Sequence, residues 1–171
     1  MGIKEEIAGI NSKVSEKIKP KEFSIKFKKL NDDAKIPEKN NLSDAGLDFF
    51  ASDKKILFPF GRKLIPTGIS WQPEGFNHDT TIVYMKMEGR SGNALKKGFG
   101  VLGGVIVQSY RGEIKVILQN NSWWFKRVKV GNKIAQGIIY NLPKYDIKIA
   151  EELNETERAD KGFGSSDKVK V

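Results

Sequence analysis

The chain has 171 residues, of which 39% are hydrophobic and 30% charged, a composition typical of one folded globular domain. This length can bury a core without disulfides or metal ions, and the composition excludes a chain that is disordered throughout. The formal net charge is +9, from 30 lysines and arginines against 21 acidic residues. A basic balance suggests an acidic partner, such as a nucleotide, nucleic acid or an anionic membrane, or it serves solubility alone.

The rare residue types exclude several classes of site. The sequence has no cysteine and a single histidine, His78. Disulfide scaffolds, cysteine-based zinc sites, cysteine nucleophiles and iron–sulfur clusters are therefore impossible. His78 belongs to the polar stretch 76–79 (FNHD), where we expect an exposed loop histidine rather than a member of a catalytic triad. No apolar run is long enough to cross a bilayer and the first residues lack a signal-peptide core, so we expect a cytoplasmic protein without membrane contact.

The first twenty residues carry one apolar stripe. Isoleucine or valine recurs at spacings of four, three, four and four residues, which predicts an amphipathic helix over residues 1–20 that ends near Pro20. The stripe consists of Ile3, Ile7, Ile10, Val14 and Ile18. We expect this helix to dock on the protein's own assembly, and a frayed tail is the alternative.

From residue 21 onward the pattern changes to that of a β protein. Phe23, Ile25 and Phe27 alternate with polar residues, as a half-buried strand requires. Many short strands without a second helical pattern indicate a β-sandwich, a jelly roll or a barrel over residues 21–150. Residues 151–171 are polar and contain glycines, which is typical of a disordered tail. Besides the first strand, β-rich runs closed by turn residues predict strands over residues 54–58, 64–71, 80–87, 104–107, 113–119, 123–130, 134–140 and 145–150.

Three further segments contain residue types that suit a nucleotide-like ligand. Residues 89–93 (GRSGN) predict a polar turn between strands, which can offer N–H groups and a hydroxyl to an anion, with Lys96 close by. Residues 101–112 place glycines and a tyrosine around a tight hairpin, which lets a flat ligand approach the backbone closely. Residues 162–166 (GFGSS) place a ring and two hydroxyls among glycines. Ordinary turns and linkers share each of these patterns, so none is specific alone.

Five motifs, taken in order, make the sequence resemble the trimeric dUTPase family, the deoxyuridine triphosphate nucleotidohydrolases. The resemblance covers roughly residues 23–167 and leaves the N-terminal helix outside. The five motifs are residues 44–48 (DAGLD), 89–92 (GRSG) with Lys96, 104–112 (GVIVQSYRG), 131–136 (GNKIAQ) and 158–166 (RADKGFGSS).

The resemblance implies an all-β jelly-roll, or β-clip-like, subunit that assembles as a homotrimer. Each active site would draw on three chains, with the C-terminal arm, residues 151–171, closing over a neighbour's nucleotide. The family cleaves dUTP between the α and β phosphates and releases dUMP and pyrophosphate. Mg²⁺ would be held through the triphosphate, without direct protein ligands. Nucleic acid is not an expected partner, because the lysines and arginines are scattered along the sequence and a bound triphosphate explains the basic charge equally well.

The resemblance also assigns roles to individual residues. Uracil would lie along Gly104, Val105 and Ile106 and pair with backbone groups, which would exclude cytosine. Tyr110 would pack under the deoxyribose and leave no room for a 2′-hydroxyl. The phosphates would be bound by Ser91, Gly92, Gln136, Arg158, Ser165 and Ser166, and uracil would be covered by Phe163 beside Gly164.

Two charged residues have roles that include a structural alternative. Asp48 would be a carboxylate that helps to order the site, and Arg90 would brace the phosphate loop by pairing internally. For both residues a purely structural salt bridge is as good an interpretation as contact with the ligand.

The sequence departs from the family pattern at Val107. The family has an aspartate there, which orients and deprotonates the attacking water and accepts a hydrogen bond from the sugar 3′-hydroxyl. Valine can do neither, and a general base typically contributes ~10²–10⁴-fold to a rate, so we expect impaired hydrolysis. Gln108 should face the opposite side of the strand, and Ser109 is not a base at neutral pH.

Two classes of function therefore stay open. The first is a dUTP diphosphatase of reduced activity. The second is a nucleotide-binding or regulatory protein that has kept the pocket and lost the chemistry. The related deaminases that act on dCTP fit less well, because the start of the first motif at residues 44–46 and the closing arm favour the dUTP side.

Overall fold

The computed structural model describes residues 22–157 and residue 159. The predicted helix over residues 1–20 lies outside the described residues. So do five residues of the fifth motif that were assigned to the nucleotide, namely Arg158, Phe163, Gly164, Ser165 and Ser166. The predicted boundaries at residues 20 and 150 stay predictions.

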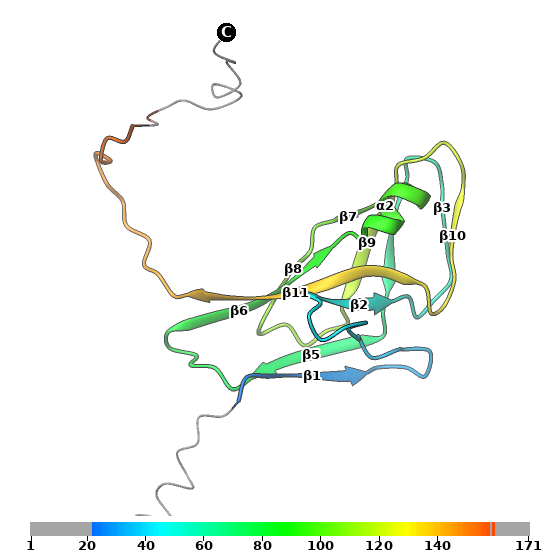
Figure 1. Ribbon diagram of the computed structural model, residues 1–171, viewed down its shortest axis with the longest axis horizontal. Helices are drawn as coiled ribbons and strands as arrows, with labels where there is room; N and C mark the ends of the chain where they lie inside the picture. Colours follow the sequence, from blue (N-terminus) through cyan, green and yellow to red (C-terminus); the bar gives the residue numbers. More distant parts are fainter. Residues whose placement is uncertain (1–21, 158, 160–171) are drawn as a thin grey trace, which may run out of the picture.

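Eleven strands and one short helix make up the described part of the chain (Figure 1). The strands that precede the helix are β1 (Ser24–Lys29), β2 (Gly46–Phe50), β3 (Lys55–Leu57), β4 (Arg62–Pro66), β5 (Ile69–Glu74) and β6 (Thr81–Glu88). The helix and the strands that follow it are α2 (Ser91–Lys97), β7 (Phe99–Leu102), β8 (Val105–Val107), β9 (Lys115–Asn120), β10 (Lys126–Val128) and β11 (Lys133–Pro143).

The strands pair into four antiparallel sheets, which confirms the predicted all-β jelly-roll class. The largest sheet has the order β2-β11-β6-β8, and a second has the order β4-β9-β7. Two small sheets pair β1 with β5 and β3 with β10. Most neighbours are far apart in the sequence, since β11 lies between β2 and β6, and such long connections are typical of jelly rolls.

One apolar core lies between the sheets. In β6 the side chains of Val83, Met85 and Met87 are buried, whereas the residues between them are partly or fully exposed. This alternation follows from the period of two along a strand. Phe49 from β2 and Leu118 from β9 are fully buried in the same cluster. The core therefore fixes which face of each strand remains free to form a site.

The helix α2 replaces the turn that the sequence predicted over residues 89–93. Its seven residues are too few to show an apolar stripe, and only Asn93 is buried. The Asn93 Nδ2 donates a hydrogen bond to the carbonyl oxygen of Lys133 at 2.8 Å, which ties the helix to β11. Gly98 ends the helix with φ 70°, and its N–H bonds back to Ala94.

Several predicted strands differ from the observed ones. The run 64–71 is divided into β4 and β5 by Thr67 and Gly68, and the run 123–130 keeps only β10. The prediction of a strand over residues 145–150 is wrong, because these exposed residues have no neighbouring strand in the described chain and leave the body as an extended segment (Figure 1). The predicted hairpin over residues 101–112 is also wrong, since β7 pairs with β9 and β8 pairs with β6.

No helix in the described range is long and apolar enough to cross a membrane.

We predict that Gly68→Ala lowers the free energy of unfolding by about 2 kcal/mol or more, measured by denaturant titration. Gly68 has φ +66°, and an added Cβ would lie 2.6 Å from the Cβ of Ala34. The matched control is Gly89→Ala, where an added Cβ meets no atom within 4 Å and no change in stability is expected. Equal stability of the two variants would contradict the assigned backbone geometry.

Candidate functional site

Three of the five motifs meet in one cleft of about 390 Å³. The first motif reaches the cleft at the start of β2, the second at the junction of β6 and α2, and the fourth along β11. The loop before β2 supplies the remaining wall. The lining residues are Asn40, Asp44, Ala45, Gly46, Asp48, Arg90, Ser91, Gly92, Gln136 and Ile138.

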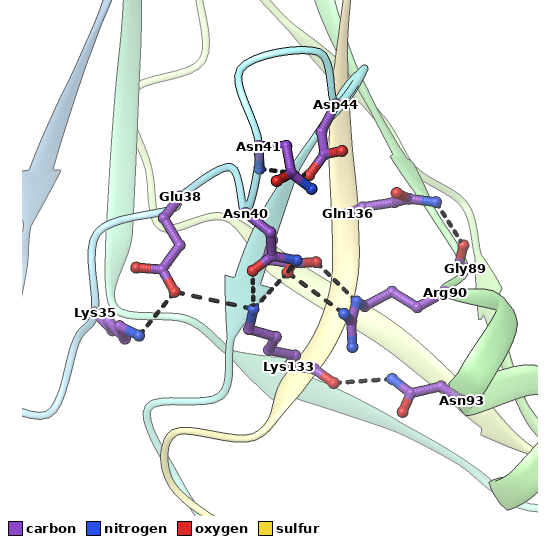
Figure 2. A network of polar contacts seen from close by, with 11 residues as sticks. Lys35, Glu38, Asn40, Asn41, Asp44, Gly89, Arg90, Asn93, Lys133 and Gln136 are labelled. Carbon is purple, nitrogen blue, oxygen red and sulfur yellow. Dashed lines mark hydrogen bonds and ion pairs between the residues drawn. The ribbon is translucent and has the colours of Figure 1, made fainter.

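The carboxylate of Asp48 lies at the centre of a polar network in this cleft. Its partners Arg90, Lys133 and Asn40 point toward one another in Figure 2. Asp48 is 6% exposed and forms ion pairs with two cations from different elements. The Arg90 Nε lies 2.7 Å from Oδ1, and its Nη2 donates a second hydrogen bond to Oδ2 at 3.4 Å. The Lys133 Nζ lies 2.8 Å from Oδ2. Arg90 therefore pairs internally, as expected, and one buried charge joins β2, the start of α2 and β11.

The loop before β2 is fastened to the same network. The Asn40 Nδ2 donates to Asp48 Oδ2 at 3.3 Å, and its Oδ1 accepts from Lys133 Nζ at 2.7 Å. The backbones of Glu38 and Asp48 also form an isolated antiparallel bridge. Asn40 and Glu38 were not singled out by the sequence, because no motif marks them and only the fold brings them to Asp48.

Ser91 and Gly92 lie at the mouth of the cleft in the first turn of α2. Both are exposed, and an added Cβ on Gly92 would meet no atom within 4 Å, so the space in front of this backbone is open. The first N–H groups of a helix have no carbonyl partner within it, and the Arg90 side chain does not cap them. This turn can therefore offer N–H groups and a hydroxyl to an anion.

Gln136 lines the cleft from β11 and is hydrogen-bonded to the second motif. Its Nε2 donates to the carbonyl oxygen of Gly89 at 3.0 Å. Its side chain also explains the glycine of the first motif, because a Cβ on Gly46 would lie 2.8 Å from Gln136 Oε1.

The third motif lies in a second, separate pocket of about 310 Å³. Val105 and Val107 are 63% and 51% exposed, whereas Ile106 packs against the core, as the alternation of a strand requires. An added Cβ on Gly104 would lie 2.7 Å from the carbonyl oxygen of Met87, so only glycine fits there. The seven lining residues are Leu64, Val105, Ile106, Val107, Tyr110, Glu113 and Lys115.

Tyr110 stands at the turn that follows β8. Its N–H bonds to the carbonyl oxygen of Val107 at 3.0 Å, and its hydroxyl donates to the carbonyl oxygen of Glu113 at 3.0 Å. The ring is 43% exposed, so it is a wall of the pocket rather than a core residue.

Glu113 supplies the one carboxylate of this second pocket, and the sequence did not single it out. Its Oε1 accepts the Gly68 N–H at 2.8 Å, and its Oε2 lies 3.4 Å from Lys115 Nζ. Both oxygens are thus already engaged. Gln108 is engaged as well, since its Oε1 accepts the Val83 N–H at 2.6 Å.

Strand β6 connects the two pockets. Glu88 is paired in register with Gln136 of the cleft, and Lys86 is paired with Val105 of the second pocket. The Lys86 Nζ lies 2.5 Å from Glu88 Oε1, and this hydrogen bond raises the pKa of Lys86 above its usual value. Lys86 therefore stays positively charged beside the third motif at any physiological pH.

Two other features bear on the chemistry. Among residues 22–157 and 159, no group of three or more histidine, aspartate or glutamate side chains is placed to hold a metal ion. His78 lines a larger hollow of about 710 Å³. It lies in an exposed loop, and its ring centroid is 4.1 Å from that of Phe76. Arg111 is the only motif residue among those that line this hollow.

We predict that Asp48→Asn lowers the free energy of unfolding by about 1–3 kcal/mol, because it leaves Arg90 and Lys133 without their shared buried partner. Thermal and denaturant unfolding measure this effect. The matched control is Asp53→Asn, which removes an exposed ion pair with Lys55 and should leave stability nearly unchanged. If Asp48→Asn were as stable as the parent, the network would not hold the cleft together.

Comparisons with known proteins agree with this arrangement. The sequence model of the dUTPase family matches residues 32–167. The deoxyuridine 5′-triphosphate nucleotidohydrolase of Clostridium tetani is 40% identical over 150 residues, which cover 86% of this chain and 99% of the relative. The corresponding protein of Hydrogenobaculum sp. is 42% identical over 148 residues, which cover 84% and 98%.

Solved structures of the Staphylococcus bacteriophage 80alpha dUTPase show the same fold. One variant with dUpNHpp is 23% identical and has a TM-score of 0.74, covering 84% of this chain and 98% of that chain. A second variant is 26% identical, with a TM-score of 0.73 over the same shares of the two chains. With the five ordered motifs, the family match over most of the sequence and this shared fold, the chain belongs to the dUTPase family.

Proposed function

We propose that the protein is a dUTP diphosphatase, which hydrolyses dUTP to dUMP and pyrophosphate. The observation that carries the proposal is the convergence of the first, second and fourth motifs around the Asp48–Arg90–Lys133 network, with Ser91 and Gly92 at the open mouth. The curated relatives named above carry the same activity in their names. Because dUTP is a charged metabolite that cells retain, we place the protein in the cytoplasm.

In this proposal the cleft binds the triphosphate. Ser91 and Gly92 donate hydrogen bonds to phosphate oxygens, and Gln136 adds a neutral donor. Arg90 is engaged by Asp48, so it braces the loop and contributes its positive field without leaving that partner. Mg²⁺ would come with the substrate on the phosphate oxygens, which is how this ion is commonly held in phosphate sites, and would neutralise their charge.

The base and the sugar would lie on the third motif. Gly104, Val105 and Ile106 offer backbone groups to uracil, and Tyr110 excludes a 2′-hydroxyl. Arg158, Phe163, Gly164, Ser165 and Ser166 would close over the bound nucleotide from the C-terminal arm.

A homotrimer would bring these parts together. Within the described residues of one chain, the cleft and the third-motif pocket have no lining residue in common, which supports a nucleotide held between the cleft of one chain and the third motif of another. We propose that each site is shared between neighbouring subunits.

The chemical step would be slow because of Val107. Water attacks the α-phosphorus, the bond from this phosphorus to the bridging oxygen breaks, and pyrophosphate leaves with the electron pair. The attacking water must lose a proton, and the exposed isopropyl group of Val107 cannot accept it. Among the described residues that line this pocket Glu113 is the carboxylate, but the Gly68 N–H and Lys115 occupy its oxygens. The same observation favours the second candidate function, a nucleotide-binding protein with little turnover.

We predict that Val107→Asp raises the rate of dUTP hydrolysis with Mg²⁺ by ~10²–10⁴-fold, the usual contribution of a positioned general base. Val107 is half-exposed, so the new carboxylate need not be desolvated and the fold should tolerate it. Pyrophosphate release measures the effect. UTP is the control substrate, which both proteins should reject.

Two results would contradict this role. If the parent protein were already fast and the variant showed no gain, another residue would be the base. If neither protein bound dUpNHpp, the pocket would serve a different purpose and the proposed function would fail.

We predict a trimeric mass in light scattering at micromolar protein concentration, because each site needs more than one chain. A monomeric mass together with tight nucleotide binding would show that one chain builds the site alone.

A further inference from the structure

Five aromatic rings gather on the surface formed by the β3–β4 connection and the segment between β9 and β10. We call them the aromatic tip. They are largely exposed, at 58% for Phe58, 51% for Phe60, 79% for Trp123, 75% for Trp124 and 60% for Phe125. None of them lines the cleft or the third-motif pocket. The proposed hydrolysis therefore does not involve these rings.

The tip is held in a fixed arrangement. Phe58 and Phe125 contact edge-to-face with ring centroids 5.0 Å apart, and Phe60 and Trp123 do so at 4.7 Å. Below them the buried Asn120 donates hydrogen bonds from Nδ2 to the carbonyl oxygens of Phe58, at 3.0 Å, and Trp124, at 2.8 Å. The rings are thus presented to solvent on an ordered backbone.

The backbone at Phe60 indicates that the tip is not a product of packing. Phe60 has φ 55°, in the left-handed region that favours glycine and is costly for a bulky side chain. Half of the Phe60 surface nevertheless remains exposed, so its burial offsets only part of this cost. Stability alone therefore does not explain a phenylalanine at this position.

The rings come directly after β3 and directly before β10 in the sequence, and the β3–β10 ladder lies at one edge of the molecule (Figure 1). Ile56 is paired with Arg127, and both are exposed, whereas the alternate residues Leu57 and Val128 are buried. Residues on one face of a strand recur every second position, so Phe58 and Phe125 continue the face that Ile56 and Arg127 present to solvent.

The charge of the surrounding segments is uniformly positive. Residues 54–64 and 121–131 contain no aspartate or glutamate. They contain seven cations, which are Lys54, Lys55, Arg62, Lys63, Lys126, Arg127 and Lys129. Lys55 forms a salt bridge with Asp53, and within the described part of the chain no salt bridge engages Arg62, Lys63, Lys126, Arg127 or Lys129. Cations that are scattered in the sequence are thus collected by the fold.

We propose that the aromatic tip and its seven cations bind single-stranded nucleic acid. Exposed rings on a positive surface match the two requirements for such binding, because bases stack on the rings and phosphates pair with the cations. Arginine beside an aromatic ring adds a further favourable contact for a base. This surface goes beyond the proposed hydrolysis and reverses the expectation, made from the sequence, that nucleic acid is not a partner.

The position of the cations favours nucleic acid over a membrane surface. A segment that enters a bilayer needs an apolar face that is separate from its charges. Here Arg62 and Lys63 follow Phe60 closely in sequence, and Arg127 lies on the face that Phe125 continues. Lys126 and Arg127 also follow Phe125 directly, so cations border the rings of both segments.

The test is fluorescence anisotropy with a fluorescein-labelled single-stranded oligodeoxynucleotide of dA and dC, at several salt concentrations. The full chain is saturated with dUpNHpp, so that the nucleotide site cannot capture the oligonucleotide. The parent should bind, and its affinity should fall as salt rises. Trp123→Ala/Trp124→Ala should weaken binding by at least about tenfold, the effect of losing one or two stacking contacts.

Two further variants separate binding from folding. Phe60→Gly should weaken DNA binding and yet leave the melting temperature equal or higher, because it relieves the left-handed backbone. Lys63→Glu/Arg127→Glu should weaken binding and flatten the salt dependence. Lys28→Glu/Lys29→Glu, an equal change of charge at exposed positions of β1, should have a much smaller effect.

Three outcomes would overturn the proposal. The first is absence of DNA binding at low salt. The second is flotation of the parent with vesicles of phosphatidylserine and phosphatidylcholine, lost in Trp123→Ala/Trp124→Ala, without DNA binding. The third is a change in oligomeric mass in the tryptophan variant, which would make the tip a subunit interface. Binding of dUpNHpp is measured separately, so a failure here is distinguishable from failure of the proposed hydrolysis.

Discussion

The buried carboxylate of Asp48 is the constraint on which the candidate site depends. A nearly buried charge must be compensated, and it is, by Arg90 and Lys133 from two other parts of the chain. The Asp48–Arg90 ion pair also fixes the residue that directly precedes Ser91 and Gly92 at the mouth of the cleft.

The separation of the cleft from the third-motif pocket follows from the sheet order. Strand β8 lies at one edge of the large sheet and β2 at the other, and the cleft is lined from β2, from β11 and from the residues that follow β6. The third motif of the same chain does not line the cleft. In the proposed trimer a neighbouring subunit would supply the third motif, and this motif carries Val107 where the family has a base. In the proposed mechanism substrate recognition and turnover are separable, because Val107 would remove proton transfer while the donors of the cleft remain.

Much of the fold could be predicted from the sequence, because alternation in stretches such as β1 and β6 is a local signal. The helix α2 could not, since its seven residues show no apolar stripe and the buried Asn93 bonds to Lys133, forty residues away. Residues 145–150 alternate like a strand, but alternation does not say whether a partner strand exists. In the site, ordered motifs identified Asp48, Arg90 and Gln136, whereas Asn40 and Glu113 carry no motif. The aromatic tip was missed because it forms only when β3 and β10 pair.

A single-turnover experiment tests the central claim, that the cleft captures dUTP but lacks an effective base. Protein in excess is mixed with labelled dUTP and Mg²⁺, and bound nucleotide and dUMP are followed in time. Complete capture followed by slow formation of dUMP and pyrophosphate is expected. Failure to capture dUTP, or conversion as fast as capture, would contradict the claim.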